Sequence, residues 1–277
     1  MIKITKLGEI MRLIRFLDNE DKKIKYCASE NEANYLIEGD IFSNFEVTSK
    51  EANISKILSP LIPKSILCIG LNYKKHAEEG NAPIPEYPVL FMKQTNSIQN
   101  PNDPIIIPKK LHSESVDYEC ELAVIIGKEC KNAKKSNALD YVLGYTCSND
   151  VSARDWQLDK GGTQWCRGKT FDTFCPLGPV ITLKDEIRDP NSLKIKTIVN
   201  GQTMQDWNTS DMIFDVPTLI EFLSGSTTLE PGTIILTGTP HGIGFARDPK
   251  VLLKKGDSVT IEIEKIGKLT NPVIDEI

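Results

Sequence analysis

The sequence predicts a β-rich α+β protein. Short runs of β-branched and aliphatic residues recur through the chain, bounded by turn formers such as NPNDP, VNGQ, EPGT and KKGD. Helical patterns are few. They are SNALDYVLG (136–144) and FDVPTLIEFLSG (214–225), the second with Pro217 in its first turn and Gly225 as a stop. No G-x-G-x-x-G fingerprint follows a strand, so the sequence does not support a dinucleotide-binding fold.

The predicted strands follow one another along the main part of the chain. They are the runs SILCIG, PVLFM, PIIIP, LAVIIG, PVITL, LKIKTIVNG, TIILTG and SVTIEIEKIG. The segment KIKTIVNGQT (194–203) is typical of a hairpin arm that ends in an Asn200-Gly201 turn. Earlier, MRLIRF and NYLIEGDIF predict two more strands. Because ILSPLIPKS (57–65) carries two prolines, we interpret it as a linker between a small N-terminal domain (1–60) and a main domain (61–277).

The composition narrows the classes of function. Hydrophobic residues make up 40% and charged residues 26% of the 277 residues, which is typical of a soluble globular protein. The net charge of −5 disfavours nonspecific nucleic-acid binding and gives no attraction to anionic membranes. No stretch approaches the ~18 apolar residues of a membrane span. The opening MIKITKLGEIMRLIRF also lacks the apolar centre of a secretory signal.

Seven cysteines, an odd number without a C-x-x-C pair, lie mostly in apolar runs. Free cysteine packs there as a small hydrophobe, so we expect reduced core residues in a cytoplasmic protein and no thiolate zinc site. MRLIRF, from Met11, is typical of a natural strand-forming start. Residues 1–10 are therefore interpreted as an extension or as the product of a misassigned start.

Two glutamates stand at the entrance of the apolar run in DYECELAVIIG (117–127). Side chains alternate between the faces of a strand, so Glu119 and Glu121 point the same way, while Cys120 and Leu122 point the other. The following LAVII is apolar on both faces, as in a buried strand. One alternative is a frayed strand end with two solvated glutamates. If they are buried, one of the two takes up a proton unless a cation joins them.

A third acid favours a metal site. Asp150 stands where the strand-like run GYTCSND (144–150) breaks. Three carboxylates at the ends of two strands form an all-oxygen ligand set that suits Mg²⁺ or Mn²⁺, with roughly three of six octahedral positions left for water or substrate. Three negative charges against two positive leave the site slightly anionic, so we expect cationic side chains to help hold an acidic substrate.

Four ordered motifs carry a resemblance to a known family. DYECEL, SNDVSARDWQ, RGKTFDTFCPLGP and LTGTPHGIG resemble the fumarylacetoacetate hydrolase superfamily, across nearly all of residues 66–277. The most similar subgroup includes 2-hydroxyhepta-2,4-diene-1,7-dioate isomerases, acylpyruvate hydrolases, and oxaloacetate decarboxylases and tautomerases. The resemblance implies a mixed β-roll with a small N-terminal α/β domain, a homodimer, and one Mg²⁺ or Mn²⁺ per site held by Glu119, Glu121 and Asp150.

The resemblance also implies roles for other residues. Arg154 and Gln157 match positions near metal and substrate, Lys169 matches a lysine that faces substrate, and Thr239 matches a residue that contacts the substrate carboxylate. Taken alone, Arg154 could simply pair with Asp150 or Asp155, and Lys169 could be a surface lysine. The loop TGTPHGIG lacks the Gly-Lys-Ser/Thr ending of a phosphate loop, although its backbone N–H groups can hold a carboxylate. His241 in this loop is assigned no role.

The segment NYKKHAEEGN, after SILCIG, predicts a short helix that closes over a substrate. Asn72 is the expected N-cap and Gly80 the expected stop. His76 and Glu79 are three residues apart and so share a helix face, whereas Glu78 is expected to point away. The pair resembles the water-activating dyad of the family's acylpyruvate hydrolases, in which Glu79 orients His76. Without the resemblance, His76 is interpreted equally well as an exposed surface histidine.

The combined interpretation is a small-molecule enzyme. The resemblance implies a divalent-metal-dependent hydrolase that cleaves C–C bonds of acylpyruvate-type 2-oxo acids through an enolate stabilised by the metal and Lys169. The alternative is an isomerase, tautomerase or decarboxylase on the same substrates, and loss of His76 is expected to abolish hydrolysis while sparing decarboxylation or keto–enol exchange. A third interpretation, of another class, is a catalytically silent metal- or ligand-binding protein.

Overall fold

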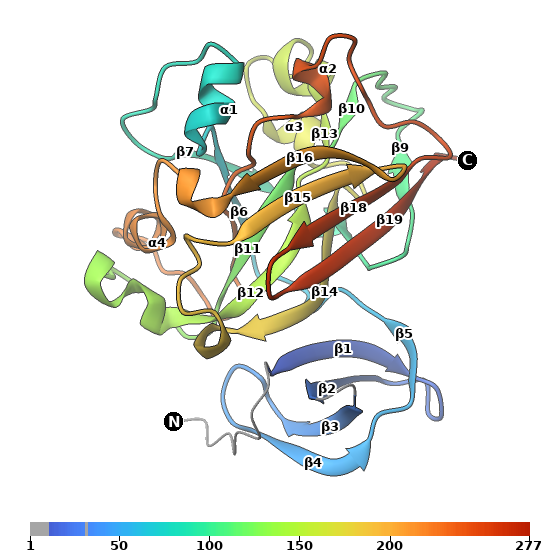
Figure 1. Ribbon diagram of the computed structural model, residues 1–277. Coiled ribbons are helices and arrows are strands. Elements are labelled where there is room, and N and C mark those ends of the chain that lie inside the picture. Colours follow the sequence, from blue (N-terminus) through green and yellow to red (C-terminus); the bar gives the residue numbers. More distant parts are fainter. Residues whose placement is uncertain (1–10, 31–32) are drawn as a thin grey trace.

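The computed structural model describes residues 11–30 and 33–277. The interpretation of residues 1–10 as an extension or misassigned start therefore falls outside the described residues. Figure 1 shows the first strands below a larger body that holds the rest of the large sheet, the second sheet and the helices. In the part of the chain that is described, no helix has the length and apolar character needed to cross a membrane.

The N-terminal region forms an antiparallel set of strands. They are β1 (Arg12–Asp18), β2 (Ile24–Glu30), β3 (Ala33–Gly39), β4 (Phe45–Glu51) and β5 (Ile54–Ile57). Both strands expected here are confirmed, but the described residues before 58 contain no helix, so this region is all-β rather than α/β. β1 pairs through Arg12 and Leu13 with β14 (Cys175–Leu183), which makes one continuous sheet of the two regions. The domain boundary near residue 60 stays a prediction.

The large sheet continues in the order β14-β12-β11-β17-β6-β7. Its remaining strands are β6 (Ile66–Gly70), β7 (Val89–Lys93), β11 (Cys120–Ile126), β12 (Val142–Asn149) and β17 (Ile234–Leu236), with β8 (Ile98–Gln99) beside β14. Every residue of β11 is buried because it packs on both faces. Leu122 and Val124 belong to the core shared with the second sheet, whereas Ala123 and Ile125 belong to a separate core. Alternation turns Glu121 to the side of Ala123.

The second sheet covers one face of the first and confirms the mixed, β-rich class. Its order is β16-β15-β18-β19-β9, formed by β16 (Gln202–Asn208), β15 (Lys194–Val199), β18 (Ser258–Ile263), β19 (Gly267–Asp275) and β9 (Ile105–Ile107). The predicted hairpin is confirmed: Asn200 and Gly201 take φ of 51° and 81°, the positive values that a type I′ turn requires. β10 (Val116–Asp117) pairs with β13 (Ser152–Ala153) in a small separate ribbon.

The helices are short and lie around the larger body rather than among the first strands (Figure 1). They are α1 (Lys74–Glu79), α2 (Arg154–Leu158), α3 (Cys166–Lys169) and α4 (Val216–Ser224). The helix predicted at 214–225 is confirmed as α4. The helix predicted at 136–144 is wrong in its last three residues. A 3-10 helix covers Lys135–Tyr141, and β12 begins at Val142, where pairing with β11 and β14 overrides the local helical pattern.

The expected cap of α1 is also wrong. The N-cap is Tyr73, which makes no side-chain cap bond, while Gly80 ends the helix as predicted. The side chain of Asn72 instead donates to the carbonyls of Thr237 and Phe214 and accepts from the Phe214 N–H. Asn72 therefore fastens the start of α1 to two distant loops, a use of asparagine that short-range patterns do not predict.

Asp215 is the N-cap of α4, and its replacement by alanine is expected to lower the free energy of unfolding by about 1 kcal/mol. Its carboxylate accepts from the Thr218 N–H at 2.9 Å and pairs with Lys135 at 2.9 Å. Burial raises the pKa of Asp215, but the bonds from Thr218 and Lys135 outweigh it and hold the pKa below its usual value. The stabilisation is therefore full above the unfolded-state pKa and is lost as the pH falls through the folded-state pKa.

Urea unfolding at pH 7 and at pH 3 measures this effect. Asp206→Ala is the matched control, because Asp206 lies on β16 in an exposed pair with Lys196. The control is expected to change stability by less than about 0.5 kcal/mol at either pH. Equal losses for Asp215→Ala at both pH values would contradict the capping role.

Candidate active site

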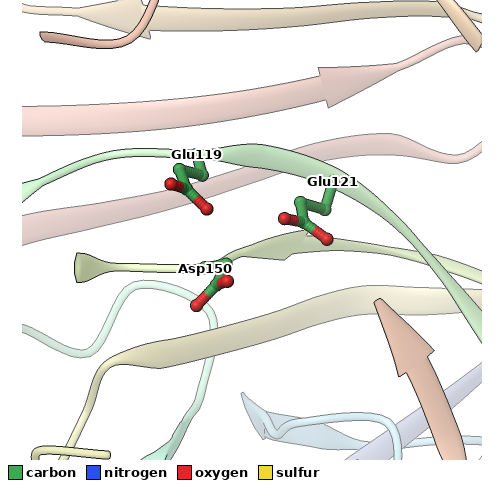
Figure 2. A group of neighbouring side chains, drawn as sticks. All are labelled: Glu119, Glu121 and Asp150. Atoms are coloured by element: carbon green, nitrogen blue, oxygen red, sulfur yellow. The ribbon is translucent and has the colours of Figure 1, made fainter. Parts of the chain in front are cut away.

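Three carboxylates converge where β11 begins and β12 ends. The two strands are antiparallel with Cys120 opposite Asn149, so Glu119 and Asp150 flank the same end of the pair. Figure 2 shows Glu119 and Glu121 extending from one strand toward Asp150. One ligand oxygen from each lies within 4.8 Å of the others, and all three residues are buried. The structure thus brings together the three acids that the sequence analysis selected.

Three cations surround these acids. Lys169, at the end of α3, places Nζ 2.8 Å from Glu119 Oε2 and 2.8 Å from Asp150 Oδ2. Arg154, at the start of α2, contacts Glu119 Oε1 at 2.6 Å. Lys93, at the end of β7, lies 2.5 Å from Asp150 Oδ1 and also donates to the Val151 carbonyl. Lys169 and Arg154 were selected from the sequence, whereas Lys93 was missed.

The alternative interpretations of Arg154 and Lys169 do not hold. Lys169 is only 1% exposed and so is not a surface lysine. Arg154 pairs not with Asp150 or Asp155 but with Asp117, whose Oδ2 accepts from Nε at 3.0 Å and from an Nη at 2.8 Å.

Asp117 also ties Arg154 to the glycine-rich loop, and the sequence analysis missed it. Its carboxylate accepts from the N–H groups of Gly244 and Phe245 at 2.8 and 3.0 Å, and is fully buried. Asp117 opens the DYECEL motif, yet nothing near it in the sequence indicates partners that lie 37 and more than 120 residues away. It therefore positions both a cationic side chain and a loop of the site.

The electrostatics of the acids suit a divalent cation. Burial raises the pKa of Glu119, but the charges of Lys169 and Arg154 outweigh it and hold the pKa well below its usual range. For Glu121 the balance is reversed: burial, with Asp150 and Glu119 close by, raises its pKa. In the described part of the chain Glu121 forms no ion pair, and it accepts only the Gly238 N–H at 2.8 Å. A buried carboxylate beside two others without its own cation fits a Mg²⁺ or Mn²⁺ site made by these three acids.

The predicted dyad is present on α1. His76 Nδ1 lies 3.2 Å from Glu79 Oε2, and Glu79 Oε1 accepts from the Gly242 N–H at 2.8 Å. Burial raises the pKa of Glu79, but bonds from His76 and Gly242 outweigh it and lower the pKa overall. Because an ionised Glu79 can only accept, the hydrogen bond between the two side chains requires a proton on Nδ1 of His76. Glu78 pairs with Lys75 at 2.7 Å and points away, as expected.

One cavity of about 410 Å³ joins these groups. Its polar lining consists of His76, Glu79, Glu119, Glu121, Arg154, Gln157, Lys169 and Thr239, which are all the selected site residues except Asp150. Gln157 accepts from Arg154 at 3.0 Å. The apolar wall includes Phe91, Leu158, Trp165, Ile243 and Phe245. A small acidic molecule in this cavity would meet carboxylates, cations and a histidine base together.

Comparisons with known proteins identify the family of this chain. The family model for the fumarylacetoacetate hydrolase C-terminal region matches residues 65–274. The mitochondrial oxaloacetate tautomerase fahd2 of Xenopus laevis is 50% identical over 233 residues, which cover 84% of this chain and 72% of that protein. The human mitochondrial oxaloacetate tautomerase FAHD2A is 48% identical over 212 residues, covering 76% of this chain and 67% of the relative. The cytoplasmic location expected for this chain stays a prediction.

Solved structures give the same result. A 2-hydroxyhepta-2,4-diene-1,7-dioate isomerase from Mycobacterium marinum is 37% identical with a TM-score of 0.83, covering 96% of this chain and 99% of that one. A 5-carboxymethyl-2-hydroxymuconate delta-isomerase from Mycobacterium smegmatis is also 37% identical, with a TM-score of 0.84 and coverage of 96% and 100%. Sequence, fold and site together place this chain in the fumarylacetoacetate hydrolase family of enzymes.

Proposed function

We propose that the protein is a divalent-metal-dependent tautomerase that exchanges the enol and keto forms of oxaloacetate. One observation carries the proposal: the His76–Glu79 dyad and Lys169 line the same cavity as Glu119 and Glu121. The relatives named as oxaloacetate tautomerases, about half identical over most of this chain, support this substrate. The comparisons thus favour the isomerase alternative over the hydrolase that the sequence analysis put first.

Binding of the substrate falls to the polar lining of the cavity. Oxaloacetate carries two carboxylates, which Arg154 and Thr239 of the cavity lining would contact, with Gln157 held against Arg154. Glu119, Glu121 and Asp150 would hold the metal ion, which when bound supplies a Lewis acid for the 2-oxo group and the adjacent carboxylate. The homodimer implied by the family resemblance is part of the proposal and awaits a measurement of mass in solution.

Proton transfer falls to the dyad and Lys169. His76 Nε2 removes a proton from C3 of the keto form, while Glu79 holds the ring and stabilises its charged form. Negative charge then develops on the C2 oxygen, where the Lys169 ammonium stabilises it. Return of the proton from His76 to that oxygen gives the enol, and the reverse sequence gives the keto form, so no proton is gained or lost.

The intact dyad also favours a second candidate, hydrolysis of a C–C bond in an acylpyruvate. His76 would then take its proton from water rather than from C3. Two assays with Mg²⁺ separate the candidates. Decay of the ultraviolet absorbance of enol-oxaloacetate measures tautomerisation, and release of pyruvate from acetylpyruvate measures cleavage. Acceleration of the first alone supports the tautomerase, and acceleration of the second alone overturns it.

Replacement of His76 by glutamine is expected to slow enol–keto exchange about 100-fold to 10,000-fold, because glutamine can hydrogen-bond but cannot take a proton. Glu78→Gln is the matched control, since it lies on the same helix, pairs with Lys75 and does not line the cavity. The control should keep the wild-type rate. Full exchange in His76→Gln would show that another group moves the C3 proton and that the dyad serves hydrolysis alone, as the sequence analysis expected.

A further inference from the structure

Gln205 lies behind the cavity wall and contacts four groups. It is on β16, is only 1% exposed, and does not itself line the cavity. Its Oε1 accepts from the Cys120 N–H at 3.0 Å and from the Thr197 hydroxyl at 2.6 Å. Its Nε2 lies 2.9 Å from Thr239 Oγ1 and 2.7 Å from the Pro240 carbonyl. The amide therefore has no unused hydrogen-bonding capacity.

The orientation of this amide is settled by its backbone partners. The Cys120 N–H can only donate, so it requires the amide oxygen. The carbonyl of Pro240 can only accept, so it requires the amide nitrogen. A flipped amide would break both bonds at once, and the cost of two unsatisfied buried groups excludes it. The Nε2 group consequently donates to Thr239.

This donation decides what Thr239 offers to the cavity. Its oxygen already accepts from Gln205, and within residues 11–30 and 33–277 no group accepts its hydroxyl proton. Thr239 is 4% exposed, and that surface faces the cavity. We propose that Gln205 is a positioning residue that fixes the Thr239 hydroxyl as a hydrogen-bond donor into the site. Thr239 then favours a ligand with an anionic oxygen at this position over a ligand that presents a hydrogen-bond donor. The inference rests on the proposed function in taking that oxygen to belong to a substrate carboxylate.

A purely structural role has a different signature. Cys120 stands between Glu119 and Glu121, so Gln205 also steadies the strand that carries two of the acids. If Gln205 acted mainly through that strand, its loss would weaken binding of Mg²⁺ itself. If it acts through Thr239, Mg²⁺ binding is retained and only binding of the anion suffers.

A double-mutant cycle on binding, without turnover, separates these roles. Titration calorimetry measures Mg²⁺ alone, then oxalate in saturating Mg²⁺, for wild type, Gln205→Met, Thr239→Val and the double variant. Each single variant is expected to weaken oxalate binding about tenfold, the effect of losing one hydrogen bond to a charged group. The double variant should bind oxalate no more weakly than Thr239→Val, and the affinity for Mg²⁺ should stay within about twofold in Gln205→Met.

Two further variants complete the test. In a Thr239→Ser background, which restores the hydroxyl, Gln205→Met should again weaken oxalate binding about tenfold. If Gln205→Met does not fold, Gln205→Leu carries the cycle, since it also removes the donor to Thr239 and adds no charge. Equal effects of the Gln205 variant in the wild-type and Thr239→Val backgrounds overturn the inference. Because no assay here uses oxaloacetate, a protein that fails to tautomerise it but passes the cycle loses only the proposed function.

Discussion

Replacement of Lys169 by methionine is expected to lower kcat for enol–keto exchange about 100-fold to 1,000-fold, the loss seen when one preorganised donor to a developing oxyanion is removed. Its ammonium lies 2.8 Å from both Glu119 and Asp150, lines the cavity, and faces the Phe91 ring at 4.9 Å. Methionine fills similar space without the charge. Since ground-state binding also uses the metal and Arg154, KM should change much less than kcat.

The control for this variant is Lys160→Met. Lys160 lies just after α2, is half exposed, pairs with Asp155 at 2.9 Å and lies over the Trp156 ring at 5.3 Å. Its loss therefore removes two surface contacts to residues that do not line the cavity. The rate of Lys160→Met should equal that of wild type. Melting curves in Mg²⁺ show whether Lys169→Met is folded, because it leaves two buried acids without their shared cation. A folded Lys169→Met protein with kcat within about threefold of wild type would remove Lys169 from the mechanism.

The three acids of the site could be predicted because neighbouring residues in the sequence determine where their side chains lie. The alternation of E-C-E-L fixes Glu119 and Glu121 on one face, and the break after GYTCSN marks Asp150 as a strand end. The same local logic predicted α4, the Asn200-Gly201 turn and the spacing of the dyad. In each case the determining residues lie within a few positions of one another.

The missed residues have partners far along the chain. Lys93 meets Asp150 across 57 positions, and its strand VLFMK is typical of an ordinary alternating strand whose terminal lysine is normally solvated. Gln205 meets Cys120 across 85 positions. Only the assembled fold places such groups together, so neither residue type nor spacing reveals them. The start of β12 is the converse case, in which sheet pairing turned the last three residues of an expected helix, 142–144, into strand.

Replacement of Glu121 by glutamine is expected to have opposite effects on stability without and with Mg²⁺. In EDTA the variant should melt at a higher temperature than wild type. The change removes one of three buried carboxylates whose oxygens lie within 4.8 Å of one another, and among the described residues Glu121 is the member of this group that has no ion pair. Glutamine keeps an oxygen that can accept the Gly238 N–H, so packing and the loop contact are retained. Relief of about 1 kcal/mol corresponds to a rise in Tm of about 2–4 °C.

Addition of Mg²⁺ should then make the melting temperature of the wild type higher than that of Glu121→Gln. At a Mg²⁺ concentration of about 100 times Kd, binding stabilises the wild type by about 2.7 kcal/mol, which raises its Tm by about 5–10 °C. The variant lacks one charged ligand for the metal, so its Tm should change little. The control Glu114→Gln removes one negative charge from an exposed residue away from the site. Its melting temperature should equal that of the wild type both in EDTA and in Mg²⁺. A variant that is destabilised in EDTA and still gains fully from Mg²⁺ would mean that Glu121 is structural. The crossing of the two melting temperatures is thus the signature expected of a cation held among these three acids, because the charge of Glu121 destabilises the protein without the metal and binds the cation when it is present.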